Sequence, residues 1–259
     1  MTQPQLQKML FKYLIDRYGK ENVIFSKDYL LAEGDYPVML VAHMDTVGSV
    51  LPSEIYFDPV QEVMWSPWLL GADDRAGIYA IMQLLEKGYR PSVLFTTDEE
   101  MGGIGAQMLT LDYPTCPLKQ LHAIIELDRR GERDCVFYDC KNDSFTKYIS
   151  ALGFTETTGS FSDISFIAPT WGVAAVNLSV GYRFEHTRYE TLHVKWLEST
   201  IEKLEKLFKK EDVIPFFQYI PDPNAFKIFP DPDKMEKNDT IDVFELIKNT
   251  SKLNAPLDF

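Results

Sequence analysis

A helical repeat of apolar residues opens the chain and predicts an amphipathic helix over residues 3–18. Its members are Leu6, Met9, Leu10, Tyr13 and Leu14. Short runs rich in Val, Ile and Leu follow, as is typical of strands buried on both faces of a mainly parallel sheet: 38–42, 92–97, 121–127 and 173–179. Helical patterns separate or follow these runs, at 74–88, 103–110, 143–152 and 189–210. The alternation predicts an α/β fold, a three-layer α/β/α sandwich with a mixed, mainly parallel sheet.

Two segments depart from this alternation. Residues 54–65 predict an antiparallel hairpin or edge pair. Residues 212–259 hold six of the 15 prolines together with five Phe and Tyr residues between 216 and 229. This composition predicts an extended C-terminal extension packed on a surface, then a short helix near 240–248.

One of Asn142, Asp143 and Ser144 is expected to cap the helix over 143–152.

The net charge and the composition of the chain argue against some classes of binding partner. The chain has 26 Lys and Arg against 39 Asp and Glu, a formal charge of 26 − 39 = −13. This charge opposes binding to nucleic acid or to anionic membranes. No apolar run approaches the ~20 residues of a membrane-spanning helix, and the N-terminus lacks a signal-peptide pattern. Cys116, Cys135 and Cys140 form no C-x-x-C pair, so a reduced, cytoplasmic setting is expected.

Acidic and histidine residues that could bind a ligand lie where predicted strands end or predicted helices begin. In an open α/β sheet the carboxyl ends of the strands form one rim, where ligands bind. Five segments are therefore expected to meet there: His43-Met44-Asp45, Asp73-Asp74, Asp98-Glu99-Glu100, Asp128 and His186. Imidazole and several carboxylates at one place favour a divalent cation, and these ligand types suit zinc.

Each segment taken alone has an ordinary structural explanation. His43 and Asp45 suit a polar turn, and Asp73-Asp74 suits a helix start. The acidic run at 98–100 suits a solvated strand end, and Asp128 beside Arg129 suits a surface ion pair. His122 and His193 are interpreted as structural. The ordinary explanation requires all five coincidences at one sheet edge, which favours a metal site.

The wider sequence around these residues resembles a known group of enzymes. The motifs are HMDTVG, LLGADDRAGIYAI, TTDEEMGGIGA, ELD and GYRFEHTRYE, in order between about residues 38 and 200. They resemble the motif series of the co-catalytic two-zinc exopeptidases and amidohydrolases. That clan includes peptidase T-like tripeptidases, tetrahedral aminopeptidases, carboxypeptidase G-like enzymes and single-domain zinc aminopeptidases.

The resemblance implies a role for each matching residue and two Zn²⁺ ions per chain, with Co²⁺ or Mn²⁺ as alternatives. His43 and Asp128 would bind one zinc ion, and Glu100 and His186 the other. Asp73 would bridge the two ions, or Asp74 if the register differs by one. Asp45 would orient the His43 ring, and Glu99 would be the general base. The resemblance also implies a cis peptide bond between Asp73 and Asp74.

The resemblance further implies a hydrolase of peptide bonds, foremost an aminopeptidase acting on short peptides. An N-acyl amino acid amidohydrolase or carboxypeptidase-type deacylase is the alternative, followed by a silent relative that serves as a binding module. Tyr182 and Arg183 are candidates for stabilising the oxyanion. Arg129 and Arg130 either bind a substrate carboxylate or pair with neighbouring acids, and pairing is favoured.

Many relatives insert a lid or dimerisation domain near the later ligand segments. Here only 57 residues (186 − 129) separate Asp128 from His186, and strands and helices of the sandwich need them. The sequence therefore predicts no inserted domain, with residues 1–211 as a single catalytic domain and 212–259 as its extension. The oligomeric state is left open.

Overall fold

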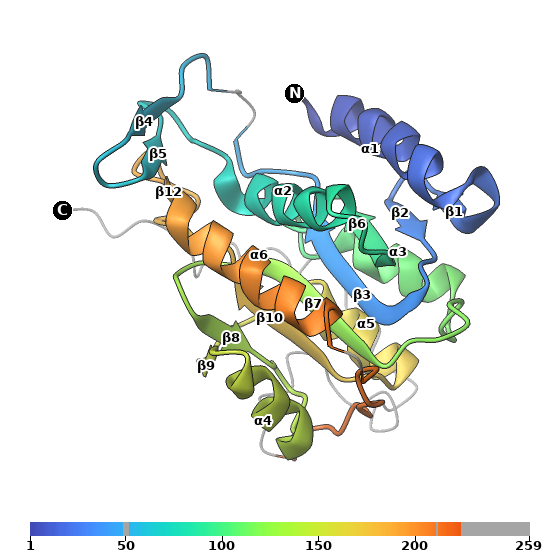
Figure 1. Cartoon of the computed structure of the whole chain (residues 1–259). Helices are drawn as coiled ribbons and strands as arrows, with labels where there is room; N and C mark the ends of the chain where they lie inside the picture. Colours follow the sequence, from blue (N-terminus) through green and yellow to red (C-terminus); the bar gives the residue numbers. More distant parts are fainter. Residues whose placement is uncertain (49–51, 211, 224–259) are drawn as a thin grey trace, which may run out of the picture. The chain divides into compact units, whose positions relative to one another are not determined.

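A mixed eight-stranded sheet runs through the compact unit formed by residues 1–223 (Figure 1). The structure is a computed structural model that describes residues 1–48, 52–210 and 212–223. The strand order is β1-β2-β6-β3-β7-β10-β8-β9. The bounds are β1 Val23–Phe25, β2 Tyr29–Ala32, β3 Tyr36–His43, β6 Pro91–Thr96, β7 Ala123–Arg129, β8 Asp134–Val136, β9 Thr155–Glu156 and β10 Ala175–Ser179.

The four central strands β6, β3, β7 and β10 run parallel and correspond to the four predicted apolar runs. In register, Leu40 of β3 lies between Val93 of β6 and Ile125 of β7. All three side chains are fully buried, because helices cover both faces of the sheet. The antiparallel strands β1, β2 and β8, and the short β9, add edges that the sequence analysis did not predict.

Alternating residues of β3 separate two hydrophobic cores. Leu40 packs into the core shared with α1, α2, α4 and α6, whereas Met39 and Val41 pack into the core shared with α3 and α5. The bounds are α1 Gln3–Tyr18, α2 Ala72–Glu86, α3 Ile104–Asp112, α4 Asp143–Ala151, α5 Ile164–Trp171 and α6 Val194–Phe208, with a 3₁₀ turn η1 at Lys20–Asn22. The predicted three-layer sandwich is confirmed.

Helix ends follow the local sequence with one correction. The Asn142 side chain accepts a hydrogen bond from the Phe145 N–H at 3.1 Å, so Asn142 caps α4. The last helix begins at Val194, so the predicted start at residue 189 is wrong. Residues Thr191–His193 are instead strand β12, because they pair with Val63–Trp65 of β5.

A second, four-stranded antiparallel sheet has the order β11-β12-β5-β4. Its bounds are β4 Tyr56–Asp58, β5 Val63–Trp65, β11 Tyr182–Arg183 and β12 Thr191–His193. The β4–β5 pair confirms the predicted hairpin. Its partners β11 and β12 come from the segment that carries His186, so this sheet links two regions more than 100 residues apart in sequence.

Residues 212–223 extend along the main unit. Single bridges join Val173 to Gln218 and Cys140 to Pro221, and the side chains of Ile214 and Phe217 are buried in the larger core. The predicted helix near 240–248 lies outside the described residues, and the division of the chain at residue 211 stays a prediction. Between Asp128 and His186 the chain forms β8, α4, β9, α5, β10 and β11, without an inserted domain.

The three cysteines are free thiols. Across the described part of the chain, none of the helices has both the length and the apolarity that crossing a lipid bilayer requires.

Candidate metal centre

All five predicted segments meet at the carboxyl edge of the main sheet. His43 ends β3, Glu99 and Glu100 follow β6, and Asp128 lies near the end of β7. These strands are neighbours in the order β6-β3-β7, so their ends are adjacent. Asp73 lies in the first turn of α2, and His186 lies in the loop between β11 and β12.

Two triads of potential metal ligands share the Asp73 carboxylate. In the first triad, His43 Nε2 lies 3.0 Å from Asp73 Oδ1 and 3.5 Å from Asp128 Oδ1. In the second, His186 Nε2 lies 3.1 Å from Asp73 Oδ2 and 2.8 Å from Glu100 Oε1. Within each triad the ligand atoms all lie within 4.8 Å of one another. Each oxygen of Asp73 thus faces a different triad, the arrangement that a bridging carboxylate requires.

Asp45 fixes the orientation of the His43 ring. Its Oδ1 lies 3.1 Å from His43 Nδ1, so the opposite ring nitrogen, Nε2, faces the first triad. The same carboxylate accepts the backbone N–H groups of Glu99 and Glu100, each at 3.1 Å. One side chain therefore couples the position of the histidine to that of the acidic turn after β6.

Asp73 is held by a residue that the sequence analysis missed. The Glu190 carboxylate accepts the N–H of Gly71 at 2.7 Å and of Asp73 at 3.0 Å, and Glu190 is buried. The peptide bond between Asp73 and Asp74 is cis, which confirms that prediction. Asp74 belongs to neither triad: its carboxylate accepts the N–H of His43 and of Gly77.

Sequence offered only a weak signal for Glu190. It is the last residue of GYRFEHTRYE, the same motif that carries His186. An acid in a short strand-to-strand connection usually faces solvent, so nothing in the local pattern indicated that this one is buried.

Buried carboxylates give the site an excess of negative charge. Burial raises the pKa of Glu99 to about 10, and the neighbouring Asp128 acts in the same direction. Burial also raises the pKa of Asp128 to about 6, with Asp73 adding repulsion. Hydrogen bonds to Asp73 and Glu100 raise the pKa of His186 to about 10. Divalent cations would offset this repulsion, and the donor set of imidazole nitrogens and carboxylate oxygens suits zinc. The residues present therefore fit a pair of such ions.

Polar side chains from β10, from β11 and from the loop before α5 hold Asp128 in place. The Tyr182 hydroxyl donates to Asp128 Oδ1 at 3.0 Å, and the Ser162 hydroxyl lies 3.3 Å from Oδ2. The Asn177 side chain binds both the N–H and the carbonyl of Asp128 at 2.9 Å. Tyr182, a candidate for stabilising an oxyanion, thus already donates its proton to a predicted metal ligand. Asn177 was missed because a single polar residue in an apolar run carries no periodic signal, and Ser162 because it lies in a polar loop where a serine is common.

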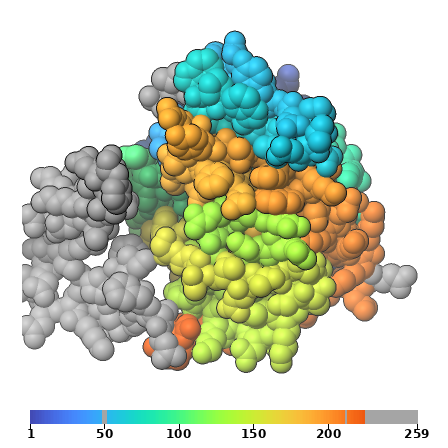
Figure 2. Space-filling view, turned by 90° about the vertical axis from the view of Figure 1, so that its left-hand side faces the viewer, coloured from blue at the N-terminus to red at the C-terminus, as the bar shows by residue number. Residues whose placement is uncertain are grey.

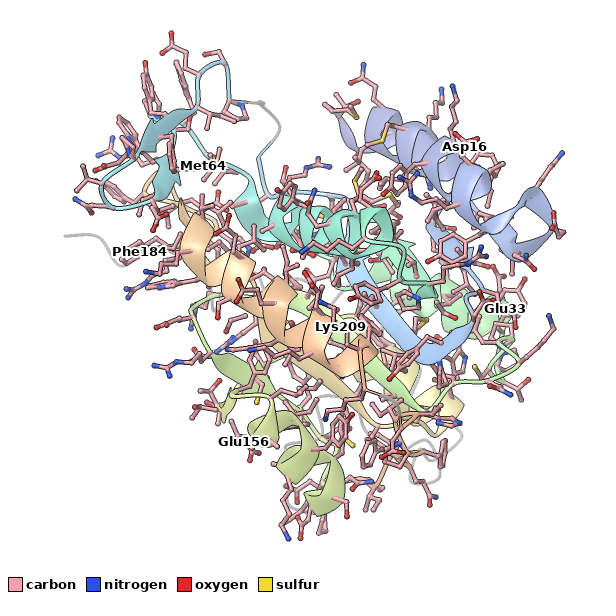
Figure 3. All side chains as sticks on the ribbon, viewed as in Figure 1. Asp16, Glu33, Met64, Glu156, Phe184 and Lys209 are labelled. Atoms are coloured by element: carbon pink, nitrogen blue, oxygen red, sulfur yellow. The ribbon has the colours of Figure 1, made fainter. Side chains whose placement is uncertain are left out.

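Arg183 lies away from the triads. Its guanidinium lies over the Phe184 ring, and it lines a neighbouring cavity with Phe184 and Trp196. Figure 3 shows Phe184 at the same end of the molecule as Met64 of the small sheet. The structure therefore brings together the predicted ligands, Asp45, Glu99 and Tyr182, and leaves Arg183 outside.

A cavity of about 490 Å³ opens onto the triads. Its lining includes Asp73, Glu99, Glu100, Asp128 and His186, together with Arg129, Arg130 and residues 158–161. Figure 2 shows the yellow-green segments around residues 130–160 and the orange segment that follows residue 180 next to one another on one face. The volume lies within the ~300–1,000 Å³ typical of small-molecule sites.

The fold resembles that of solved peptidase structures. No family model and no curated protein matches the sequence. Among solved structures, a tripeptidase from Staphylococcus aureus superposes with a TM-score of 0.61 at 15% identity, over 80% of this chain and 93% of that one. The chain has the fold of these peptidases. A TET aminopeptidase from a marine sediment archaeon (Thaumarchaeota) gives a TM-score of 0.58 at 14% identity, over 80% and 92% of the two chains. An aminopeptidase from Desulfurococcus kamchatkensis gives 0.56 at 13%, over 82% and 90%.

Proposed function

We propose that this protein is a metal-dependent peptidase with two zinc ions per chain, acting as an aminopeptidase on short peptides. The observation that carries the proposal is the Asp73 carboxylate shared between two triads, with Glu99 beside them. The fold shared with tripeptidases and aminopeptidases supports it. A binding module would have no physical need for so many uncompensated carboxylates at one place.

His43, Asp73 and Asp128 would hold one zinc ion, and Asp73, Glu100 and His186 the other. Ions held there would supply a bound water of lowered pKa and a polarised carbonyl at the scissile bond. Co²⁺ or Mn²⁺ would suit the same carboxylate-rich donor set. The positive charge of ions at these triads would also favour the ionised form of Glu99, which a general base requires.

Glu99 then moves the proton. Its carboxylate takes a proton from the water as the oxygen adds to the carbonyl carbon. Glu99 delivers that proton to the amide nitrogen as the C–N bond breaks, so the products are a carboxylate and an amine. Asp45 keeps this turn in place through the Glu99 N–H, and a ligand atom of Glu99 lies within 4.8 Å of those of His43 and Glu100.

The fold shared with aminopeptidases favours an aminopeptidase, which acts on peptides with a free α-ammonium group. Arg129, which lines the cavity over the triads, favours a second candidate: hydrolysis of N-acyl amino acids, which carry a free carboxylate.

The free thiols support a proposed cytoplasmic location. The proposed substrates are short peptides rather than nucleic acid or membranes.

Glu99→Gln tests the chemistry directly. We expect kcat on a free-amino dipeptide to fall by about 10²–10⁴-fold, the contribution of general acid–base catalysis. Zinc content, measured by elemental analysis, should remain two ions per chain, because the two proposed zinc triads do not include Glu99. The matched control is Glu202→Gln, an exposed glutamate on α6, which should leave kcat unchanged.

Two results would contradict the proposal. One is full activity in Glu99→Gln, and the other is wild-type protein that binds no zinc when zinc is supplied. Peptides with free and with N-acetylated termini separate the two candidates. Preference for the free amine supports the aminopeptidase, and preference for the N-acetylated substrate supports the amidohydrolase.

A further inference from the structure

The cavity over the triads is lined by side chains of both charges. Its lining includes the metal-binding carboxylates and also Arg129 and Arg130. Arg130 forms an ion pair with Glu185 at 2.5 Å, which largely neutralises it. Arg129 forms no ion pair with a carboxylate in the described part of the chain, so of these two arginines only Arg129 keeps an unbalanced positive charge.

Arg129 has only part of its hydrogen-bonding capacity filled. One guanidinium nitrogen, Nη2, donates to the Thr158 carbonyl at 3.0 Å. Its Nε–H is buried and, in the structure as described, has no acceptor. A buried donor without an acceptor is unfavourable, and a guanidinium presents Nε and Nη in a fork that matches the two oxygens of a carboxylate.

The position of Arg129 limits which carboxylate it can bind. Arg129 follows Asp128 directly at the end of β7, and both residues line the same cavity as the two triads. A carboxylate bound by Arg129 would therefore lie close to the bond being cleaved, within the residue that leaves as the amine.

We propose that Arg129 binds the free α-carboxylate of the leaving residue and so selects substrates in which the cleaved bond precedes the last residue. This inference rests on the proposed function and adds a specificity-determining residue to it. Dipeptides and N-acyl amino acids share this carboxylate, whereas longer or C-terminally amidated peptides lack it at that position.

The first experiment compares alanyl-alanine with alanyl-alaninamide. We expect the zinc-loaded wild type to prefer the free acid by about 10-fold or more in kcat/KM, the range for a hydrogen-bonded charge pair. Arg129→Met should bring the ratio close to one, mainly by raising KM for the acid. Arg129→Lys, which keeps the charge but loses the fork, should retain an intermediate ratio.

Arg133→Met is the matched control. Arg133 lies four residues further along the chain, is exposed and pairs with Glu132. We expect its ratio of acid to amide to equal that of the wild type. If Arg129 serves only to tether residue 158, Arg129→Met will lower activity on both substrates equally, and that outcome overturns the inference.

A binding measurement separates this inference from the proposed function. Calorimetry with N-acetylalanine and its amide, carried out in Glu99→Gln and in the Glu99→Gln, Arg129→Met double variant, measures carboxylate selectivity without turnover. Selective binding that is lost in the double variant supports the inference even if no peptide is cleaved by the wild type, a result that would refute the peptidase alone. Turnover without any preference for acid over amide refutes the inference alone. Cleavage of alanyl-alanine or of N-acetylalanine identifies which of the two substrate types is used.

Discussion

The two triads share Asp73 but are built from different kinds of structure. His43 and Asp128 of the first triad lie at the ends of central strands, and His43 is only 2% exposed. His186 of the second triad lies in the connection between β11 and β12, with a positive φ of 63° and a side chain 48% exposed. Glu100 follows β6 in a turn anchored by Asp45.

This difference predicts two metal sites of unequal strength. Ligands on packed strands are held in place before a metal arrives, so less conformational entropy is lost when it binds. A half-exposed histidine in a loop loses more freedom and remains open to solvent. The first triad is therefore expected to bind its ion more tightly, and the second to exchange its ion and face the substrate.

Substitution of each histidine should give the largest contrast. We expect His186→Ala to leave one tightly bound zinc ion per chain. His43→Ala should weaken zinc binding at the first triad by more than the ~10–100-fold typical of losing a residue that only orients a ligand. It should also lower the melting temperature, because it leaves buried carboxylates without their partner. Elemental analysis after dialysis against a weak chelator measures the retained zinc.

His193→Ala is the control for both variants. His193 stacks on Trp196 and contacts neither triad, so two ions should remain. If His43→Ala retains its tight ion and His186→Ala loses both, the order of strengths inferred from burial is reversed.

The same contrast explains what the sequence could predict. The four central strands of the large sheet, the helices other than α5, and the ligands at the strand ends followed from periodicity and from the rule that parallel strands share a carboxyl edge. His43, Glu99, Glu100 and Asp128 each come directly after or near the end of an apolar run, so their convergence was predictable.

The small sheet was only half predicted. The β4–β5 hairpin has a local signal, but β12 is three residues long and its pairing partner lies more than 100 residues earlier. For that reason the sequence predicts a helix that includes residues 189–193, whereas α6 begins at Val194. Glu190 was missed as well, because its role depends on a long-range contact with Gly71 and Asp73.

Asp45→Asn tests how far the rigidity of the first triad depends on one carboxylate. We expect zinc affinity at the first triad to fall by about 10–100-fold, since the amide holds the His43 ring less firmly than the carboxylate does. The second triad should be affected less, through the Glu100 N–H alone. Competition with a fluorescent chelator measures both affinities.

Asp16→Asn is the matched control for that variant. Asp16 is exposed on α1, where Figure 3 labels it, and is expected to leave both affinities unchanged. Equal weakening of both sites in Asp45→Asn would show instead that Asp45 acts on the whole acidic turn rather than on His43.

Glu190→Gln tests whether the shared bridge depends on the small sheet, and its expected effect is the smallest. A glutamine has one acceptor oxygen, so either the Gly71 N–H or the Asp73 N–H would face an amide donor. An unsatisfied buried donor costs about 1–3 kcal/mol, which lowers the melting temperature of a chain this size by roughly 2–4 °C per kcal/mol. Because Asp73 belongs to both triads, the two zinc affinities should fall by similar factors, unlike in the histidine variants. Calorimetric scanning and chelator competition measure these effects, with exposed Glu202→Gln as control. A fall confined to the second triad would mean that Glu190 stabilises the His186 loop rather than the bridging carboxylate.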